Sequence, residues 1–362
     1  MRRIGTSVRI LTTVALAVLL APFVSAFTVI TVPVGDNPGA LDVVPQTGEL
    51  AVVNSGTNDV SIVDPLTLHV STVPAGLMPA GIAVNRATGY AYVTNSWDDT
   101  VTAIYGYGEG KKRKVYRVGA GPGTLAVNSR TNQVYVVNNT DGTVTAIDDS
   151  TGTTRTIPVG TRPRGIAVNE VTNRIYVTNI WDNTVTVIDG STTSVVATIP
   201  VVAYPYDVAV NPVTNRIYVG SGDVSSVTVI DGATHATLDL AGPWQPGLLA
   251  VNPVTNTVYA SGLQTGGGIM VIDGATNAVT VISTPIPSWG YVSLGAPKVN
   301  ERTNTVYIAD SSTNSLLTLD GATNALTSQA LDYMPCAVAV NPSNNKVYVS
   351  HCSDSRISIL DR

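Results

Sequence analysis

Short apolar runs separated by polar turns recur along the chain at intervals close to forty residues. The clearest copy, at residues 163–203, holds four runs of five to eight residues that are rich in Val, Ile, Thr and Tyr. Such runs predict β-strands, and the apolar period near 3.6 residues that a helical repeat would need is absent. A four-stranded unit of this length is typical of one blade of a β-propeller.

The copies can be aligned on the last residue of the first run. This residue is Pro45 in the first copy and Asn in the next seven, at intervals of 40, 43, 41, 42, 41, 48 and 41 residues. The seven are Asn85, Asn128, Asn169, Asn211, Asn252, Asn300 and Asn341. Asn side chains bond to nearby backbone, so a turn is predicted after the first strand. An Asp-Gly pair follows the third run in four copies and predicts a tight hairpin there, at Asp189, Asp231, Asp273 and Asp320.

The two ends of the chain predict how the ring closes. The last copy ends at residues 359–362, after its third strand, whereas residues 27–35 resemble a fourth strand with no blade before it. We therefore predict an all-β fold, an eight-bladed β-propeller of four-stranded antiparallel blades, in which the N-terminal strand completes the last blade. Residues 27–362 would form this single domain. Seven blades are the alternative, because the first copy, LDVVPQTGELAVVN, is divergent.

Residues 1–26 have the pattern of a signal peptide. Arg2, Arg3 and Arg9 precede a mostly apolar stretch at residues 10–24, and small residues follow at 25 and 26. We predict an exported protein, whether periplasmic, secreted or on the cell surface; an uncleaved anchor is the alternative. Beyond the leader no run of eighteen apolar residues occurs, so no transmembrane span is expected in the mature chain.

Charge narrows the choice of partners. Of 20 basic and 25 acidic residues, the leader contains three Arg and no acid, which leaves 17 basic residues and a net charge of −8. We expect no nucleic-acid partner, because a net negative charge is unfavourable for binding to phosphates. The low charged fraction of 12% fits sheets that neighbouring blades cover on both faces. We expect a monomer.

Two cysteines and three histidines are the residues most able to carry chemistry. Cys336 and Cys352 fall near facing positions of two adjacent predicted strands, and an exported protein favours a disulfide between them. A soft metal site that also uses His351 is the alternative. His69 and His235 lie in other copies, so no shared histidine site is expected. We predict no cofactor, with a divalent metal in the channel as the minor alternative.

The large aromatic residues gather on one predicted face. Because strands alternate in direction, loops between the second and third strands share a face with the connections between copies. All four Trp fall there, and the predicted ligand-binding set is Trp97, Trp181, Trp244, Trp289, Arg162, Arg164, Tyr204 and Tyr206. Such residues make interaction hot spots, so this face would bind a protein, peptide or glycan. The alternative is that the rings wedge between blades.

The strand motifs resemble a known repeat family. RIYVTN at 174–179, AYVTN at 91–95 and TVTVIDG at 184–190 are similar to the YVTN family of β-propeller repeats. The resemblance implies an exported or surface-associated propeller with a binding or scaffold role. Related propellers include streptogramin lyase and lactonases, which use a channel metal or a His with nearby acids. A metal-dependent lyase or lactonase-like hydrolase is therefore the alternative function.

Overall fold

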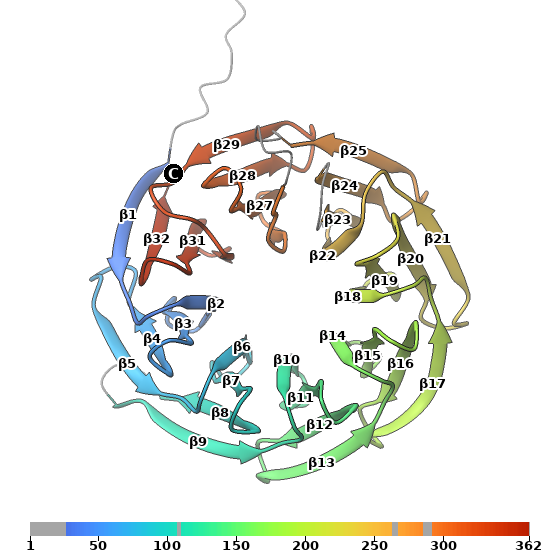
Figure 1. Ribbon diagram of the computed structural model, residues 1–362, viewed down its shortest axis with the longest axis horizontal. Helices are drawn as coiled ribbons and strands as arrows, with labels where there is room; N and C mark the ends of the chain where they lie inside the picture. The colour runs from blue at the N-terminus through green and yellow to red at the C-terminus, as the bar shows by residue number, and fades with distance from the viewer. Residues whose placement is uncertain (1–26, 107–109, 263–266, 285–291, 362) are drawn as a thin grey trace, which may run out of the picture.

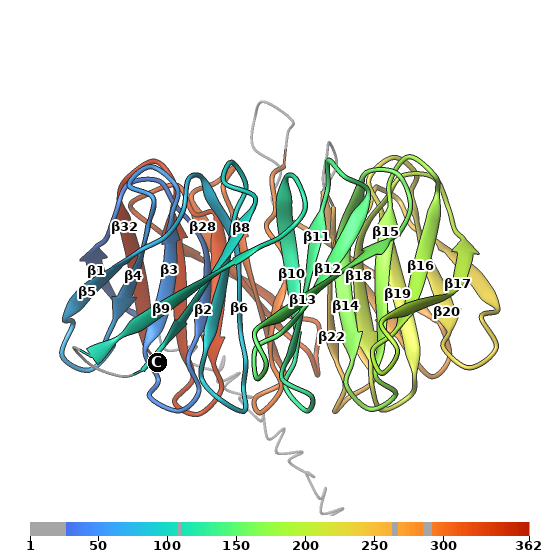
Figure 2. The same cartoon turned by 90° about the horizontal axis from the view of Figure 1, so that it is seen from below.

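The computed structural model describes residues 27–106, 110–262, 267–284 and 292–361. Over these residues 32 strands form eight four-stranded antiparallel sheets. The sheets stand radially around a central axis (Figure 1) and form a thick disc when viewed from the side (Figure 2). The eight-bladed prediction is confirmed. The divergent first copy forms a complete blade, β2-β3-β4-β5, so the seven-bladed alternative is wrong.

Each blade runs outward from strand A at the axis to strand D at the rim. The A strands are β2 (Pro38–Val43), β6 (Pro79–Val84), β10 (Pro122–Asn128), β14 (Pro163–Asn169), β18 (Pro205–Asn211), β22 (Pro246–Asn252), β26 (Lys298–Asn300) and β30 (Ala337–Asn341). The B strands are β3 (Leu50–Asn54), β7 (Ala91–Asn95), β11 (Gln133–Asn138), β15 (Arg174–Asn179), β19 (Arg216–Ser221), β23 (Thr257–Gly262), β27 (Thr305–Asp310) and β31 (Lys346–His351). The C strands are β4 (Asp59–Val63), β8 (Thr100–Tyr105), β12 (Thr143–Asp148), β16 (Thr184–Asp189), β20 (Ser226–Asp231), β24 (Gly268–Asp273), β28 (Ser315–Asp320) and β32 (Arg356–Asp361). The D strands are β5 (Val70–Pro74), β9 (Lys112–Arg117), β13 (Thr153–Pro158), β17 (Ser194–Pro200), β21 (Thr237–Ala241), β25 (Val279–Ser283), β29 (Leu326–Ala330) and β1 (Thr28–Pro33).

The ring closes as the sequence predicts. Strand β1 pairs antiparallel with β32 along its whole length, from Thr28 opposite Asp361 to Pro33 opposite Arg356. The last blade therefore has the order β1-β32-β31-β30, and the C-terminal end lies beside β1 (Figure 1). A single blade thus joins both ends of the described chain, so the ring has no open seam between its first and last blades.

The hydrophobic core lies between blades. In one such layer Tyr135 and Val137 from β11 pack with Ile175 and Val177 from β15, and all four are almost completely buried. Burial of side chains of this size contributes roughly 1.5–3 kcal/mol each. Because every sheet has a neighbour on both faces, strands B and C are buried and mostly uncharged, which accounts for the low charge content of the chain.

Buried Asn side chains form hydrogen bonds at two recurring positions of the blade, the end of strand B and the end of strand A. At the end of β15, Asn179 Nδ2 donates to Thr184 Oγ1 (3.0 Å) and Thr186 Oγ1 (2.9 Å) of β16, while its Oδ1 accepts from Gly160 N–H (3.0 Å). These bonds explain why a polar residue ends an apolar B strand, since a buried amide without partners would cost free energy.

In six blades the Asn at the end of strand A links neighbouring blades. Asn169 Oδ1 accepts from the N–H groups of the following turn, as predicted, and its Nδ2 donates to Asn215 Oδ1 of the next blade (2.8 Å). Six blades make this inter-blade bond, through the pairs Asn85–Asn132, Asn128–Asn173, Asn169–Asn215, Asn211–Asn256, Asn252–Asn304 and Asn300–Asn345. The sequence predicted the turn but not the bond between blades.

The Asp-Gly pairs lie in C to D hairpins, as predicted, but the loops are longer than the two residues that this dipeptide favours. In the fourth blade the C to D turn runs from Asp189 to Ser194, and the residue with positive φ is Thr193 (50°). Asp189 Oδ1 accepts from backbone N–H groups within the turn. Gly190 is required by space instead, because a Cβ there would lie 2.2 Å from Asn173 Oδ1.

Candidate functional site

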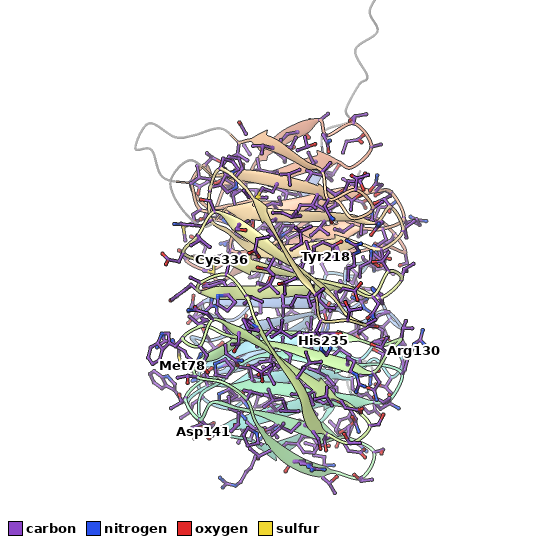
Figure 3. The ribbon with its side chains drawn as sticks, turned by 90° about the vertical axis from the view of Figure 1, so that its right-hand side faces the viewer. Met78, Arg130, Asp141, Tyr218, His235 and Cys336 are labelled. Atoms are coloured by element: carbon purple, nitrogen blue, oxygen red, sulfur yellow. A yellow bond between two sulfur atoms is a disulfide. The ribbon has the colours of Figure 1, made fainter. Side chains whose placement is uncertain are left out.

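One face of the disc carries the B to C loops and the connections between blades, as predicted. The two kinds of segment bond to each other: Trp97 N–H donates to Leu77 O (3.3 Å), and Trp181 N–H donates to Thr161 O (3.4 Å). Both indoles are mostly exposed, Trp97 at 74% and Trp181 at 62%. Figure 3 shows this face on its left, where Met78 lies, whereas Arg130 of an A to B turn lies on the opposite face. We call the first of these the Trp-bearing face.

The residue that precedes strand A has left-handed backbone in five blades. The occupants are Asn37, Met78, Gly121, Arg162 and Tyr204, with φ between 49° and 64°. This conformation suits Gly and Asn but is unfavourable for Met, Arg and Tyr. Neighbouring segments hold it in place: Arg162 O accepts from Ile180 N–H (3.2 Å), and Tyr204 N–H donates to Asn183 Oδ1 (2.9 Å). Three large side chains are therefore presented from strained positions, a feature that clusters at functional sites.

Two Arg side chains stack on aromatic rings on the Trp-bearing face, near the start of strand A. The Arg162 guanidinium carbon lies 4.9 Å from the centre of the Trp181 ring, and that of Arg164 lies 3.7 Å from the centre of the Tyr206 ring. Arg164 also donates to the Tyr206 hydroxyl. The structure thus brings together four predicted residues from the fourth and fifth blades. Arg164 and Tyr206 belong to the start of strands β14 and β18 rather than to the connections, which refines their predicted place.

A cavity of about 330 Å³ opens beside these stacked groups. It is lined by Ala80, Gly81, Gly123, Thr124, Val137, Asn139, Arg162, Pro163 and Arg164. The described lining holds two cations and no acid. Polar contacts make its wall rigid: Thr124 Oγ1 donates to Arg164 O, and Asn139 Nδ2 donates to Pro163 O at 2.8 Å. Its volume is sufficient for a small charged group with an apolar neighbour.

The other two predicted Trp differ from this pair. The Trp244 ring packs over Gly262 and Gly268 of the sixth blade, where an added Cβ would lie 2.7 Å and 2.5 Å from the ring. Trp244 therefore packs against the sixth blade, and neither of the stacked Arg side chains pairs with it. Trp289 lies outside the described residues.

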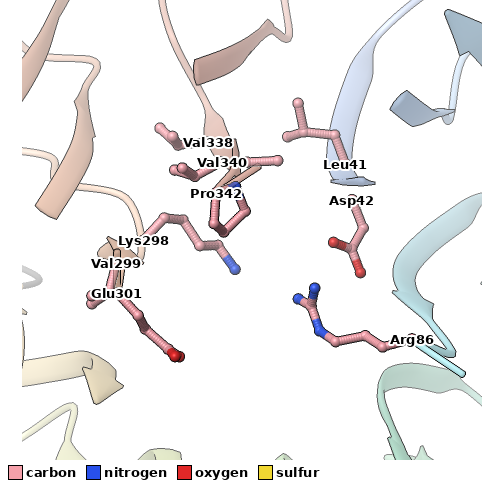
Figure 4. Close-up of a pocket in the computed structure, with 10 residues that line it drawn as sticks. Leu41, Asp42, Arg86, Lys298, Val299, Glu301, Val338, Val340 and Pro342 are labelled. Carbon is pink, nitrogen blue, oxygen red and sulfur yellow. The ribbon is translucent and has the colours of Figure 1, made fainter. Parts of the chain in front are cut away.

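The opposite end of the channel has a second cavity, of about 310 Å³ (Figure 4). Its charged residues are Asp42, Arg86, Lys298 and Glu301, so acids and bases are present in equal number. Sequence reasoning did not single out these residues, although the repeat contains a signal. The strand pairing shows that Asp42 corresponds to Ala83, so Val44, and not Pro45 as predicted, corresponds to the Asn that ends the other A strands. The position of Asp42 and Lys298 in strand A is Ala in the six other blades, at Ala83, Ala126, Ala167, Ala209, Ala250 and Ala339.

Asp207 is an acid held inside the channel wall. Its Oδ1 accepts from Val208 N–H (2.9 Å), and its Oδ2 accepts from Leu249 N–H of the next blade (3.0 Å). Burial raises the pKa of Asp207, and these two hydrogen bonds together with the charges of Lys298 and Arg164 oppose that increase. Asp42 makes the same pair of bonds, to Val43 and Val84 N–H, in the first blade.

Cys336, Cys352 and His351 make contacts that stabilise the fold. Cys336 and Cys352 form a disulfide that joins the start of β30 to the end of β31, as predicted, which leaves no thiolate for the soft-metal alternative. His351 is completely buried and shares a hydrogen bond with Ser358 Oγ (2.8 Å), and burial lowers its pKa. His69 and His235 lie in other blades. Within the described ranges no three His, Cys, Asp or Glu side chains gather as metal ligands would.

Comparison with known proteins supports the fold. No family model matches the chain, so the YVTN resemblance is not confirmed. A PE-PGRS family protein of Mycobacterium tuberculosis is 61% identical over 36 residues, which are 10% of this chain and 8% of that protein. Virginiamycin B lyase from Staphylococcus aureus is similar in structure, with a TM-score of 0.64 and 12% identity over 93% of this chain and 99% of the lyase chain. Kuenenia stuttgartiensis hydrazine synthase has a TM-score of 0.63 and 16% identity over 90% of this chain and 96% of its own.

At these identities the likeness establishes the β-propeller and nothing further. A catalytically inactive His-to-Ala variant of the same lyase, solved with quinupristin, is also similar, with a TM-score of 0.62. In the described part of this chain, no helix is long and apolar enough to cross a membrane.

Proposed function

We propose that this protein is an exported binding module whose Trp-bearing face recognises a protein, peptide or glycan. The observation that carries the proposal is a single face that exposes Trp97 and Trp181 and presents two Arg stacked on aromatic rings. Aromatic and Arg side chains dominate binding energy at interfaces. A closed ring of blades holds them rigidly, so little conformational entropy is lost when a ligand binds.

The proposal is tested with the mature chain, residues 27–362, on peptide and glycan arrays. We expect ligands that are retained by the wild type and lost by Trp97→Ala and Trp181→Ala. The matched controls are Val213→Ala and Val254→Ala, which remove equally exposed apolar side chains from A to B turns on the opposite face. Equal loss in the controls, or array binding that ignores both Trp substitutions, would contradict the proposal.

Export is part of the same proposal. Cleavage after Ala26 would leave Phe27 as the first residue, directly before the β1 strand that closes the ring. N-terminal sequencing of protein recovered from outside the cytoplasm should therefore begin at Phe27. A chain that begins at Met1 in the membrane fraction would indicate the anchored alternative.

A metal-dependent lyase or lactonase-like hydrolase is the second candidate, because a lyase is among the proteins of similar structure. Such an enzyme would need acids or histidines that converge on a metal in the channel. Metal analysis of the purified protein, followed by thermal melts with and without a chelator, separates the two candidates. A stoichiometric divalent ion whose removal lowers the melting temperature would favour the enzyme.

A further inference from the structure

We propose that the cavity beside Arg162 and Arg164 binds an acidic peptide segment, whose carboxylate lies between the two guanidinium groups. This inference rests on the proposed function and specifies its ligand. The carboxylate would accept hydrogen bonds from N–H edges of both Arg side chains. The apolar neighbours of the acidic residue would lie along the rim of the Trp-bearing face.

The two guanidinium groups are held in place before any ligand arrives. Arg162 stacks on Trp181 and Arg164 stacks on Tyr206, to whose hydroxyl it also donates. Stacking covers the flat faces of a guanidinium and leaves N–H groups at its edges, which match a carboxylate in a bidentate arrangement. Because the side chains are already ordered, less rotamer entropy is lost on binding.

The local charge selects an anion. Arg162 and Arg164 form no ion pair within the described residues, and the described lining of their cavity contains no acid. Arg164 influences Asp207, but both carboxylate oxygens of Asp207 already accept backbone N–H groups. The cavity at the other end of the channel has two acids and two bases, so it offers no comparable preference.

The surroundings favour a peptide over an acidic sugar. The second blade, whose Ala80 and Gly81 line the cavity, exposes Leu77, Met78 and Trp97 on the same face, at 49%, 36% and 74%. Aromatic, Met and Arg side chains are enriched at protein interfaces, and apolar Leu and Met side chains suit the flanks of a peptide. A uronic acid chain would present hydroxyl groups to them instead.

Gly123 allows the cavity to be blocked without disturbing the fold. A Cβ added there would meet no heavy atom within 4 Å, and Gly123 lines the cavity. The same position of strand A already holds Arg164 and Tyr206 in the next two blades. The Gly123→Leu substitution should therefore fill the binding space and leave the melting temperature unchanged.

The experiment selects a displayed library of random heptapeptides against four proteins. These are the wild type, an R162Q/R164Q double variant, Gly123→Leu, and Arg130→Gln as a control that removes one positive charge from the opposite face (Figure 3). We expect the wild type and Arg130→Gln to select peptides that contain Asp or Glu. The other two should lose that enrichment while melting as the wild type does. If R162Q/R164Q does not fold, it is replaced by Arg164→Lys, which keeps the positive charge but lacks the planar guanidinium that stacks on Tyr206.

One selected peptide and its Asn or Gln counterpart are then compared by calorimetry at low and high salt. We expect the acidic form to bind at least tenfold more tightly, and we expect higher salt to weaken its binding. Trigalacturonate is the second probe, and it should bind at least tenfold more weakly than the peptide. An absence of selected peptides, tighter binding of trigalacturonate, or equal affinity of the neutral peptide would overturn the inference. Neutral peptides that still require Trp97 and Trp181 would overturn it and leave the proposed function standing.

Discussion

The side-chain nitrogen of Asn341 faces Gly48 across the junction between the last and first blades. A Cβ at Gly48 would lie 3.5 Å from Asn341 Nδ2, which has no hydrogen-bond partner among the described residues. In six other junctions the corresponding nitrogen donates to an Asn at this position. The ladder of Asn bonds around the ring is thus interrupted where Gly replaces its acceptor.

We predict that Gly48→Asn stabilises the protein by about 1 kcal/mol, since it supplies an acceptor to a buried donor. Gly48 has φ of 74°, a left-handed conformation that Asn tolerates. Urea unfolding of the wild type and the variant measures the change. Gly48→Ala is the control and should destabilise, because it adds a Cβ in that conformation without an acceptor. An unchanged or lower free energy of unfolding for Gly48→Asn would contradict the prediction.

The disulfide should stabilise the blade that closes the ring. Cys336 and Cys352 are 16 residues apart, and a loop of that length restricts the unfolded chain by about 3 kcal/mol. We expect the C336A/C352A variant to lose about this much free energy of unfolding. Urea unfolding of the wild type with and without a thiol reductant should give a similar difference. The variant itself should be insensitive to the reductant.

The left-handed rim positions should prefer Gly to Ala. At Tyr204, where φ is 56°, we expect Tyr204→Gly to be more stable than Tyr204→Ala by about 0.5–1 kcal/mol, because Gly adopts positive φ without steric strain. Arg164 provides the control, since it belongs to strand β14 and has ordinary extended backbone. Arg164→Gly should therefore be less stable than Arg164→Ala. Thermal or urea unfolding of the four variants gives the comparison, and the same order at both positions would refute it.

Asp207 should make stability depend on pH in a defined direction. Burial raises the pKa of Asp207 in the folded state above the usual value of 3.8, so the folded protein binds the proton more tightly than the unfolded chain. Stability relative to Asp207→Asn should therefore rise as pH falls through the folded pKa, and level off below about 3.8. Urea unfolding of both proteins between pH 4 and 8 measures this difference. A difference that is constant with pH would argue against a raised pKa.

The fold was largely predictable because a propeller repeats one local pattern. Short runs of apolar residues and Thr mark strands B and C in every copy. The last copy lacks a fourth strand and the N-terminal strand lacks a blade, so the two together imply closure. The Asp-Gly pair predicted the hairpin but not its loop, because close packing against Asn173, and not a positive φ, requires Gly190. Gly190 and Asn173 are seventeen residues apart in the chain, so the sequence of the dipeptide does not reveal their contact.

The candidate site was predictable only in part. Alternation of strand direction placed Trp97, Trp181 and Trp244 on one face, but it could not distinguish the exposed rings from the wedge at Trp244. It also could not pair Arg162 with Trp181 or Arg164 with Tyr206, since these contacts depend on rotamers and on the left-handed backbone at the rim. Lys298 departs from the Ala of the other copies, a signal that the repeat contained, whereas the alignment on Pro45 placed Val43 and not Asp42 at that position.

The sequence by itself determined the four-stranded blade repeat, the strand order within it and the face on which each loop lies, because all three follow from local periodicity and alternating direction. The structure decided between eight blades and seven, because only pairing shows that the divergent first copy forms a complete sheet. Tertiary structure alone decided which side chains are stacked, buried or free to meet a ligand. Those outcomes depend on how neighbouring blades pack, and packing joins residues about forty positions apart that no local pattern relates.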